Sequence, residues 1–151
     1  MSGLTGRYEC KIDAKGRLKL PAGLLRQLPE GSSRKFFINK GLDNYIDLYT
    51  ESNWDKITQK LEQLNRLNSK HRKFLRRFYS HAISTEMDTS DRILISKTLG
   101  ELVGIQDDVI IICYGTSIEI WAKETFDRDN DDTEDFSEMA DDIFGNTNPF
   151  E

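Results

Sequence analysis

Two related stretches of nine residues decide the fold of this chain. DAKGRLKLP occupies residues 13–21, and DTSDRILIS occupies residues 88–96, which is 75 positions later. Both contain Asp-x-x-x-Arg followed by a largely apolar segment. Further along, IDLY at 46–49 aligns with IEIW at 118–121 at an offset of 72. Matches that recur in order at nearly constant spacing indicate an internal duplication.

Each copy carries the local signals of a β–α–β–β unit. In the first copy the elements are a strand over Arg17–Leu20, a helix that begins at Pro21 and ends by Gly31, and strands over Lys35–Asn39 and Tyr45–Tyr49. In the second copy they are a helix between Ser96 and Gly104 and strands over Val109–Tyr114 and Ile118–Trp121. A unit of about 45 residues is too small to bury its own faces, so the two units are expected to pack together.

Between the copies the sequence predicts two helices. Ser52-x-x-Asp55 is a capping signal for the first, and a polar break at Asn65–Ser69 separates it from a second that runs to about Tyr79. The apolar positions are Trp54, Ile57, Leu61 and Leu64 on the first helix and Leu67, Phe74, Leu75 and Phe78 on the second. The basic positions are Arg66, Lys70, Arg72, Lys73, Arg76 and Arg77.

Charge is unevenly distributed along the chain. The net charge is −5, but the segment from residue 127 onward holds ten acidic residues and one arginine. Residues 1–126 therefore hold 20 basic and 16 acidic residues and carry a charge of +4. A mildly basic body with an acidic end is compatible with nucleic-acid binding. Within the acidic segment, a stripe of Phe136, Met139, Ala140, Ile143 and Phe144 predicts a short helix.

Several classes of protein fit poorly. No apolar run approaches the roughly 20 residues of a membrane helix, and Cys10 and Cys113 are too few for a disulfide framework, which favours the cytoplasm. His71 and His81 lack the spacing of a catalytic or metal site. Residues 127–138 approach a calcium loop, but its sixth position is aspartate where glycine is needed. The chain is therefore expected to be no enzyme and to need no metal, cofactor or small-molecule substrate.

The two Asp-x-x-x-Arg units, the helical connector and the length together resemble the MraZ transcriptional regulators, which have the AbrB-like swapped-hairpin fold. The resemblance covers roughly residues 1–126. It implies an α+β fold in which two tandem AbrB-like β-α-β-β units form an intrachain pseudo-dimer, with a helical connector and a C-terminal helix. The expected divisions are a first unit at 7–53, the connector at 54–80, a second unit at 81–124 and an acidic tail at 125–151.

The family likeness also implies a function. Its members form closed rings of identical chains and bind short direct repeats of double-stranded DNA upstream of the cell-division and cell-wall genes. We therefore expect a DNA-binding regulator, acting as a repressor at the nucleoid, whose partners are promoter DNA and further copies of the chain. Repeated DNA boxes would meet repeated subunits, and weak single contacts would add up through effective concentration.

Within the motif, three residues are expected to shape the loop. Asp13 can accept hydrogen bonds from backbone N–H groups or from Arg17, and Gly16 permits a positive φ. Asp88 takes the place of Asp13 in the second copy. The loop would then present an arginine where its strand begins.

The resemblance places DNA contact on Lys15 and Arg17 and, in the second unit, on Arg92. Lys11, on the alternating stretch before the loop, is a further basic candidate. The second unit has Asp91 where the first has glycine, and this added negative charge leads us to expect that the first unit dominates DNA contact.

Other interpretations stay open. Arg17 could serve only as an ion-pair partner of Asp13, in which case the chain would be a ring-forming structural or adaptor protein. An AbrB-like antitoxin is a third possibility, although the tail has few apolar anchors for a toxin. The basic run 70–77 could contact DNA, be merely solvated, or meet the acidic tail of a neighbouring chain.

Overall fold

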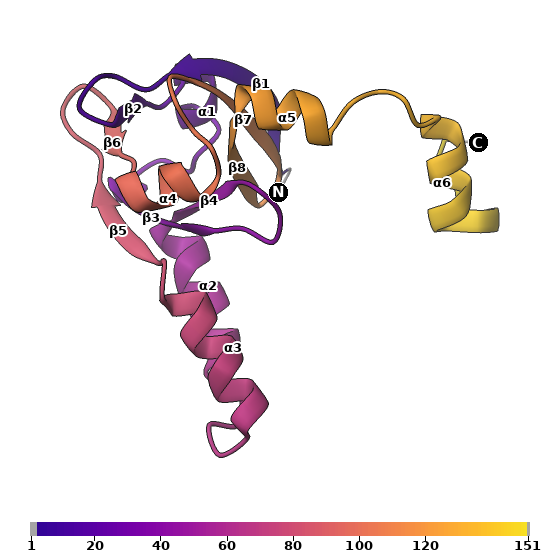
Figure 1. Cartoon of the computed structure of the whole chain (residues 1–151), viewed down its shortest axis with the longest axis horizontal. Helices are drawn as coiled ribbons and strands as arrows, with labels where there is room; N and C mark the ends of the chain where they lie inside the picture. The colour runs from indigo at the N-terminus through magenta and orange to yellow at the C-terminus, as the bar shows by residue number, and fades with distance from the viewer. Residues whose placement is uncertain (1–2, 151) are drawn as a thin grey trace.

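The computed structural model describes residues 3–150, and Figure 1 shows how its elements are arranged. The first copy contains β1 (Leu4–Lys11), β2 (Arg17–Lys19), α1 (Ala22–Leu25), β3 (Lys35–Lys40) and β4 (Ile46–Thr50). The second contains β5 (Ile83–Glu86), β6 (Arg92–Leu94), α4 (Lys97–Leu102), β7 (Asp108–Gly115) and β8 (Ser117–Ala122). Each copy is thus β–β–α–β–β, and the predicted β–α–β–β unit was one strand short.

The two copies exchange their first strands. Six strands form one antiparallel sheet in the order β1-β7-β8-β4-β3-β5, so β1 lies against the second copy and β5 against the first. In these pairings Lys11 lies opposite Asp108, and Lys35 lies opposite Glu86. The central strands β8 and β4 come from different copies, and the order is the same from either edge. The α+β fold with two tandem units forming an intrachain pseudo-dimer is confirmed, whereas the predicted domain boundaries stay a prediction.

The core lies where the sheet meets a small ribbon formed by β2 and β6 and the short helices α1 and α4. Its side chains are aliphatic and aromatic residues contributed about equally by both copies: Leu18, Leu20, Leu24, Phe36, Ile38, Ile46, Leu48, Ile93, Ile95, Leu99, Val109, Ile111, Ile118 and Ile120. Because both copies fill one core, neither can bury its apolar face alone.

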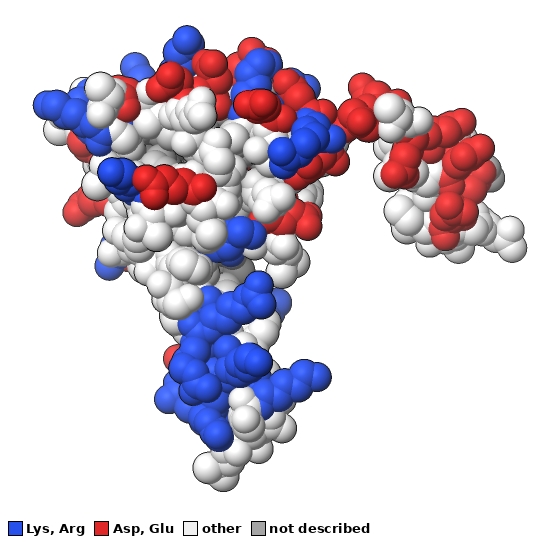
Figure 2. All heavy atoms as spheres, in the orientation of Figure 1, with Lys and Arg blue, Asp and Glu red and all other residues white. Residues whose placement is uncertain are grey.

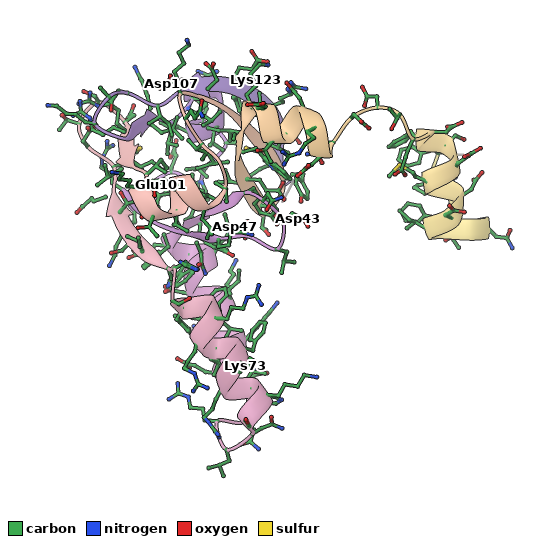
Figure 3. The ribbon with its side chains drawn as sticks, in the orientation of Figure 1. Asp43, Asp47, Lys73, Glu101, Asp107 and Lys123 are labelled. Atoms are coloured by element: carbon green, nitrogen blue, oxygen red, sulfur yellow. The ribbon has the colours of Figure 1, made fainter. Side chains whose placement is uncertain are left out.

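The opposite face of the sheet carries a smaller cluster and two acidic residues. Tyr45, Ile110 and Trp121 are buried there. Asp47 and Glu119 lie opposite each other on β4 and β8, at equivalent positions of the two copies. The Tyr49 hydroxyl donates to the Asp47 carboxylate over 3.2 Å. The Glu119 carboxylate accepts from the Trp121 indole N–H over 2.9 Å and from the Tyr114 hydroxyl. Figure 3 shows Asp47 within the body of the molecule.

A helical hairpin, α2 (Glu51–Leu61) and α3 (Ser69–Tyr79), projects from the body (Figure 1). The Trp54 ring holds its base, because it stacks 4.8 Å from the Phe37 ring and 5.6 Å from the Phe78 ring, measured between centroids. The buried Asn39 side-chain amide donates to the Phe78 carbonyl over 2.9 Å. The Phe37–Trp54 contact and the Asn39 hydrogen bond therefore fix the hairpin to β3, and the Trp54–Phe78 contact joins its two helices.

Two details of the connector differ from the prediction. The N-cap of α2 is Thr50, whose hydroxyl accepts from the Asn53 N–H, and not Ser52. The chain turns directly from β4 into the helix, so the cap falls on the last strand residue. Leu67 lies in the turn before α3 and is 90% exposed, so it does not belong to that helix's apolar side.

The C-terminal part contains α5 (Lys123–Asp129), α6 (Phe136–Phe144) and a short 3-10 turn, η1 (Gly145–Thr147). The tail prediction contained one short helix and missed α5, which packs on β7 and β8 as the counterpart of α2. Helix α6 lies apart from the body at the end of an extended segment (Figure 1). Among residues 3–150, no helix is both long enough and apolar enough to cross a membrane.

Candidate nucleic-acid interface

The two Asp-x-x-x-Arg loops meet on one short ribbon. Strands β2 and β6 form a separate two-stranded antiparallel sheet in which Leu18 lies opposite Ile93 and Lys19 lies opposite Arg92. Leu18 and Ile93 are fully buried and anchor the ribbon to the core. Because the strands are only three residues long, both loops lie within a few residues of this central pair. The duplication thus places two copies of the motif side by side.

In the first loop one carboxylate organises the backbone. Asp13 Oδ1 accepts from the N–H groups of Lys15 and Arg17, each over 2.9 Å, and Asp13 Oδ2 accepts from Arg17 Nε over 2.9 Å. The Asp13 N–H donates in turn to the Arg17 carbonyl. Asp13 therefore closes the loop and holds the Arg17 side chain by its inner nitrogen.

The second loop repeats these bonds. Asp88 Oδ1 accepts from the N–H groups of Ser90 and Arg92 over 2.8 and 3.0 Å, and Asp88 Oδ2 accepts from Arg92 Nε over 2.9 Å. A contact of 4.0 Å between Arg92 Nη1 and Asp13 Oδ2 also links the loops. Sequence divergence between the copies has left the geometry of the loop unchanged.

Both carboxylates are held in their ionised form. The pKa of Asp13 is lowered, chiefly by the hydrogen bond from the Arg17 backbone N–H and then by the Arg17 side chain. The pKa of Asp88 is lowered in the same way by the backbone and side chain of Arg92. Donors that bond to the charged form of a carboxyl favour ionisation. Each loop is consequently an ion-paired unit at neutral pH.

The loops differ in sequence at three positions, 14–16 against 89–91, and at the last of these the backbone is left-handed in both. Gly16 has φ +80°, and Asp91 has φ +62°, the only positive φ of a residue other than glycine in the described range 3–150. The Asp91 carboxylate meets Arg34 Nη2 at 3.0 Å, and the same guanidinium donates to the Asp88 carbonyl. The negative charge that we expected to oppose DNA is thus paired with a cation. Sequence reasoning missed Arg34, because 57 residues separate it from its partner.

The cationic groups at the ribbon differ in their exposure to solvent and in whether they form ion pairs. Lys15 is exposed and enters no ion pair among the described residues. Arg17 and Arg92 are each about one third exposed, and the two Nη groups of Arg17 have no hydrogen-bond partner within the described part of the chain. Lys11 lies farther back, at the end of β1, where its Nζ is 3.5 Å from Asp108. The structure therefore brings Lys15, Arg17 and Arg92 together and leaves Lys11 at the edge.

This arrangement suits recognition of a phosphate or a base edge. A guanidinium held by Nε keeps two parallel N–H donors directed outward, as phosphate oxygens or the O6 and N7 atoms of guanine require. The major groove of DNA is wide enough to admit a two-stranded β-ribbon. Figure 2 shows Lys and Arg over the end of the body formed by β2 and β6, interspersed with Asp and Glu. Within the described residues no cluster of His, Cys, Asp or Glu is placed to hold a metal ion.

Comparison with known proteins gives a consistent result over nearly the whole chain. The family model for the MraZ protein matches residues 4–77 and again residues 78–146. A protein of Christiangramia forsetii is 34% identical over 148 residues, covering 97% of this chain and 96% of its own length. Relatives from Flavobacterium psychrophilum (34% over 150 residues; 98% and 96% covered) and a Thermoanaerobacter species (40% over 138 residues; 91% and 94% covered) match similarly. All three are named transcriptional regulator MraZ.

Proposed function

This chain belongs to the MraZ family, and from that premise we propose that it is a sequence-specific DNA-binding regulator of transcription. The observation that carries the proposal is the pair of Asp-x-x-x-Arg loops with matching hydrogen bonds on the β2–β6 ribbon, with Lys15, Arg17 and Arg92 on one end of the molecule. The relatives are named as regulators of transcription, which is not an enzymatic function.

In this function Arg17 supplies the main contact with DNA. Asp13 fixes its side chain before DNA arrives, so little side-chain entropy is lost on binding. Lys15 adds a mobile positive charge beside it for a neighbouring phosphate. Arg92 is the weaker partner, because its outer Nη1 is shared with Asp13 and Asp91 lies next to it.

The target and the outcome of binding follow from the family likeness. We infer that several copies assemble into a ring, that each copy engages one short direct repeat, and that occupied repeats upstream of cell-division and cell-wall genes block transcription. A protein with this function would act in the cytoplasm, at the nucleoid. Linked weak contacts explain how a body with only a small excess of basic residues could hold DNA.

Fluorescence anisotropy of a labelled duplex tests the proposal. The duplex carries the repeats found upstream of the protein's own gene, a scrambled duplex serves as competitor, and the titration is repeated over a salt series. Wild type should prefer the repeats, and its affinity should fall steeply with salt. Arg17→Ala should lose about 5- to 150-fold in affinity, which corresponds to about 1–3 kcal/mol for a bidentate arginine contact.

Arg26→Ala is the matched control, because Arg26 is exposed, lies beyond α1 and is absent from the ribbon. It should bind like wild type. If neither duplex is preferred and Arg17→Ala changes nothing, the DNA-binding function is wrong.

One observation favours a second function. Both arginines are engaged by their own aspartates, and Arg92 also reaches Asp13, as expected of residues that only stabilise the pseudo-dimer. The chain would then be a ring-forming structural or adaptor protein. In that case Arg17→Ala would lower the stability or the assembly state and leave any DNA affinity unaltered.

A further inference from the structure

The helical hairpin has an open groove along it. Between α2 and α3 lies a cavity of about 300 Å³ whose apolar floor is formed by Leu61, Leu75 and Tyr79. Three arginines, Arg66, Arg72 and Arg76, and one carboxylate, Glu62, complete its lining, which therefore has a net positive charge. We call this the hairpin groove. Phe74 and Tyr79 of α3 are 52% and 43% exposed, so apolar surface extends beyond the groove.

The hairpin is strongly basic and its charges are unpaired. Residues 66–77 include six Lys or Arg, and no Asp or Glu occurs between residues 63 and 85. Of the ion pairs formed within residues 3–150, none involves these six side chains. Figure 2 shows this surface as the largest basic area on the visible face, and Figure 3 marks the position of Lys73 on α3 within it. The groove therefore suits an acidic partner with an apolar stripe.

Helix α6 of this chain has those properties. Residues 129–150 contain eight acidic residues and no basic one. Phe136, Met139 and Ile143 recur at helical spacing and are 67%, 43% and 71% exposed, so the apolar stripe has no cover from the body. Its packing partner is the adjoining turn η1, and Phe150 folds back to within 5.3 Å of Phe136 between ring centroids.

We propose that α6 of one copy docks in the hairpin groove of a second copy. The apolar stripe would lie on Leu61 and Leu75, and Asp142, at one side of the stripe, would meet Arg72 or Arg76. Asp141, on the outer face of α6, would add negative charge without touching the groove. Helix α6 has nine residues and is about 14 Å long, which fits along the eleven-residue helices of the hairpin. The docked helix would make a three-helix bundle of the hairpin.

The connection within the chain favours a second copy over the chain's own hairpin. Six residues, 130–135, join α5 to α6 and span about 20 Å at most. Helix α5 packs on β7 and β8, whereas the groove lies on a hairpin that starts from β4 and points away from the body. Figure 1 shows α6 and the hairpin leaving the body on different sides. A tail that reaches outward from one copy to the hairpin of the next makes a head-to-tail contact, which can close into a ring.

The test is a charge swap, followed by light scattering after size exclusion of the full chain without DNA. The hairpin variant is Arg72→Glu with Arg76→Glu, and the tail variant is Asp141→Lys with Asp142→Lys. All four positions are exposed, but Asp141→Lys removes the acceptor of the Asn148 side-chain amide, so circular dichroism checks that each variant keeps its fold. Wild type should have the mass of several chains, and each variant alone should fall to the monomer mass, because like charges now face each other across the contact.

An equimolar mixture of the two variants should recover the wild-type mass. In the mixture every tail meets a hairpin of opposite charge on the other variant, which a contact within one chain cannot reproduce. The control Arg26→Glu with Lys97→Glu changes the net charge by the same amount and sign as the hairpin variant, at exposed positions outside both elements, and should keep the wild-type mass. Phe136→Ser with Ile143→Ser should also lower the mass, without any change of charge.

The proposal is overturned if wild type is monomeric, if the variants alone keep the wild-type mass, or if the mixture fails to recover it. If wild type is monomeric and the basic hairpin instead shifts the mobility of any duplex, the hairpin serves DNA. Because no DNA is present in the scattering experiment, its failure leaves the proposed contact of Arg17 with DNA unaffected.

Discussion

Replacing Asp47 by Asn should stabilise the chain at neutral pH. Burial, aided by the charge of Glu119 across the strand pair, raises the pKa of Asp47 from 3.8 to about 6. A difference of about two pKa units corresponds to about 3 kcal/mol between the folded and unfolded states. Because Asp47 keeps some contact with solvent, we expect the substitution to add about 2 kcal/mol to the free energy of unfolding at pH 7.5.

The sign of the pH dependence follows from the raised pKa. The folded chain binds a proton at Asp47 more readily than the unfolded chain, so this residue lowers stability as pH rises from about 4 to about 6. Above that range the stability lost through ionisation of Asp47 no longer changes with pH. Urea unfolding of wild type and Asp47→Asn at pH 5.0, 6.0 and 7.5 measures the effect, and the two should converge as the pH falls.

Glu101→Gln is the matched control, because Glu101 is exposed on α4 and forms no ion pair within residues 3–150. It should change the free energy of unfolding by less than about 0.5 kcal/mol at every pH. An Asp47→Asn variant that is less stable than wild type at pH 7.5, or that keeps the same difference at all three pH values, would refute the reasoning. The Asn side chain retains an oxygen acceptor for Tyr49, so loss of that bond cannot imitate the result.

Three further predictions concern the ribbon. Leu18→Ala should cost about 3 kcal/mol of unfolding free energy, because Leu18 is fully buried opposite its counterpart in the other copy, whereas Lys19→Ala should be nearly neutral in the same urea titration. Asp91→Gly should relieve about 1–2 kcal/mol of left-handed backbone strain and lose about as much through chain entropy and the ion pair with Arg34, so the free energy of unfolding should stay within about 1 kcal/mol of wild type. Anisotropy should show severalfold tighter DNA binding by this variant. Weaker binding would mean that the Asp91 carboxylate supports the contact with DNA. Asp13→Asn should lose less stability than wild type on acidification, because the lowered pKa of Asp13 gives wild type a stabilising contribution that is present above pH 3.8 and lost below it. Acid unfolding followed by tryptophan fluorescence measures this difference. Parallel unfolding curves for the two proteins would contradict the prediction.

The duplication made much of the fold predictable from the sequence. The Asp-x-x-x-Arg motif occurs twice with the same following pattern, so two related units had to share a core, and the structure confirms this. The alternating strands and the break between the connector helices could also be predicted, because hydrophobic periodicity and capping residues indicate local structure. The loop geometry followed from one short-range interaction, between Asp13 and Arg17.

What the sequence could not supply depends on contacts between distant residues. Nothing local to β1 or β5 says that each pairs with the other copy, because exchange preserves every hydrogen bond that an unexchanged unit would make. The partnership of Arg34 with Asp91 is likewise invisible without the fold. The Thr50 cap was missed because strand and helix adjoin directly, so the usual intervening turn residues are absent.

The exchange of first strands also constrains how the chain is made. Strand β1 leaves the ribosome first, yet its partner β7 follows about 100 residues later, which at about 5–20 residues synthesised per second is a delay of roughly 5–20 s. During that time the backbone of β1 has an open edge and no partner from its own copy. Folding must wait for nearly the whole chain, because pairings of such large sequence separation form slowly. A nascent or truncated chain that ends before Asp108 therefore exposes β1 with unpaired backbone N–H and C=O groups. Chaperone binding and aggregation should concentrate at this strand.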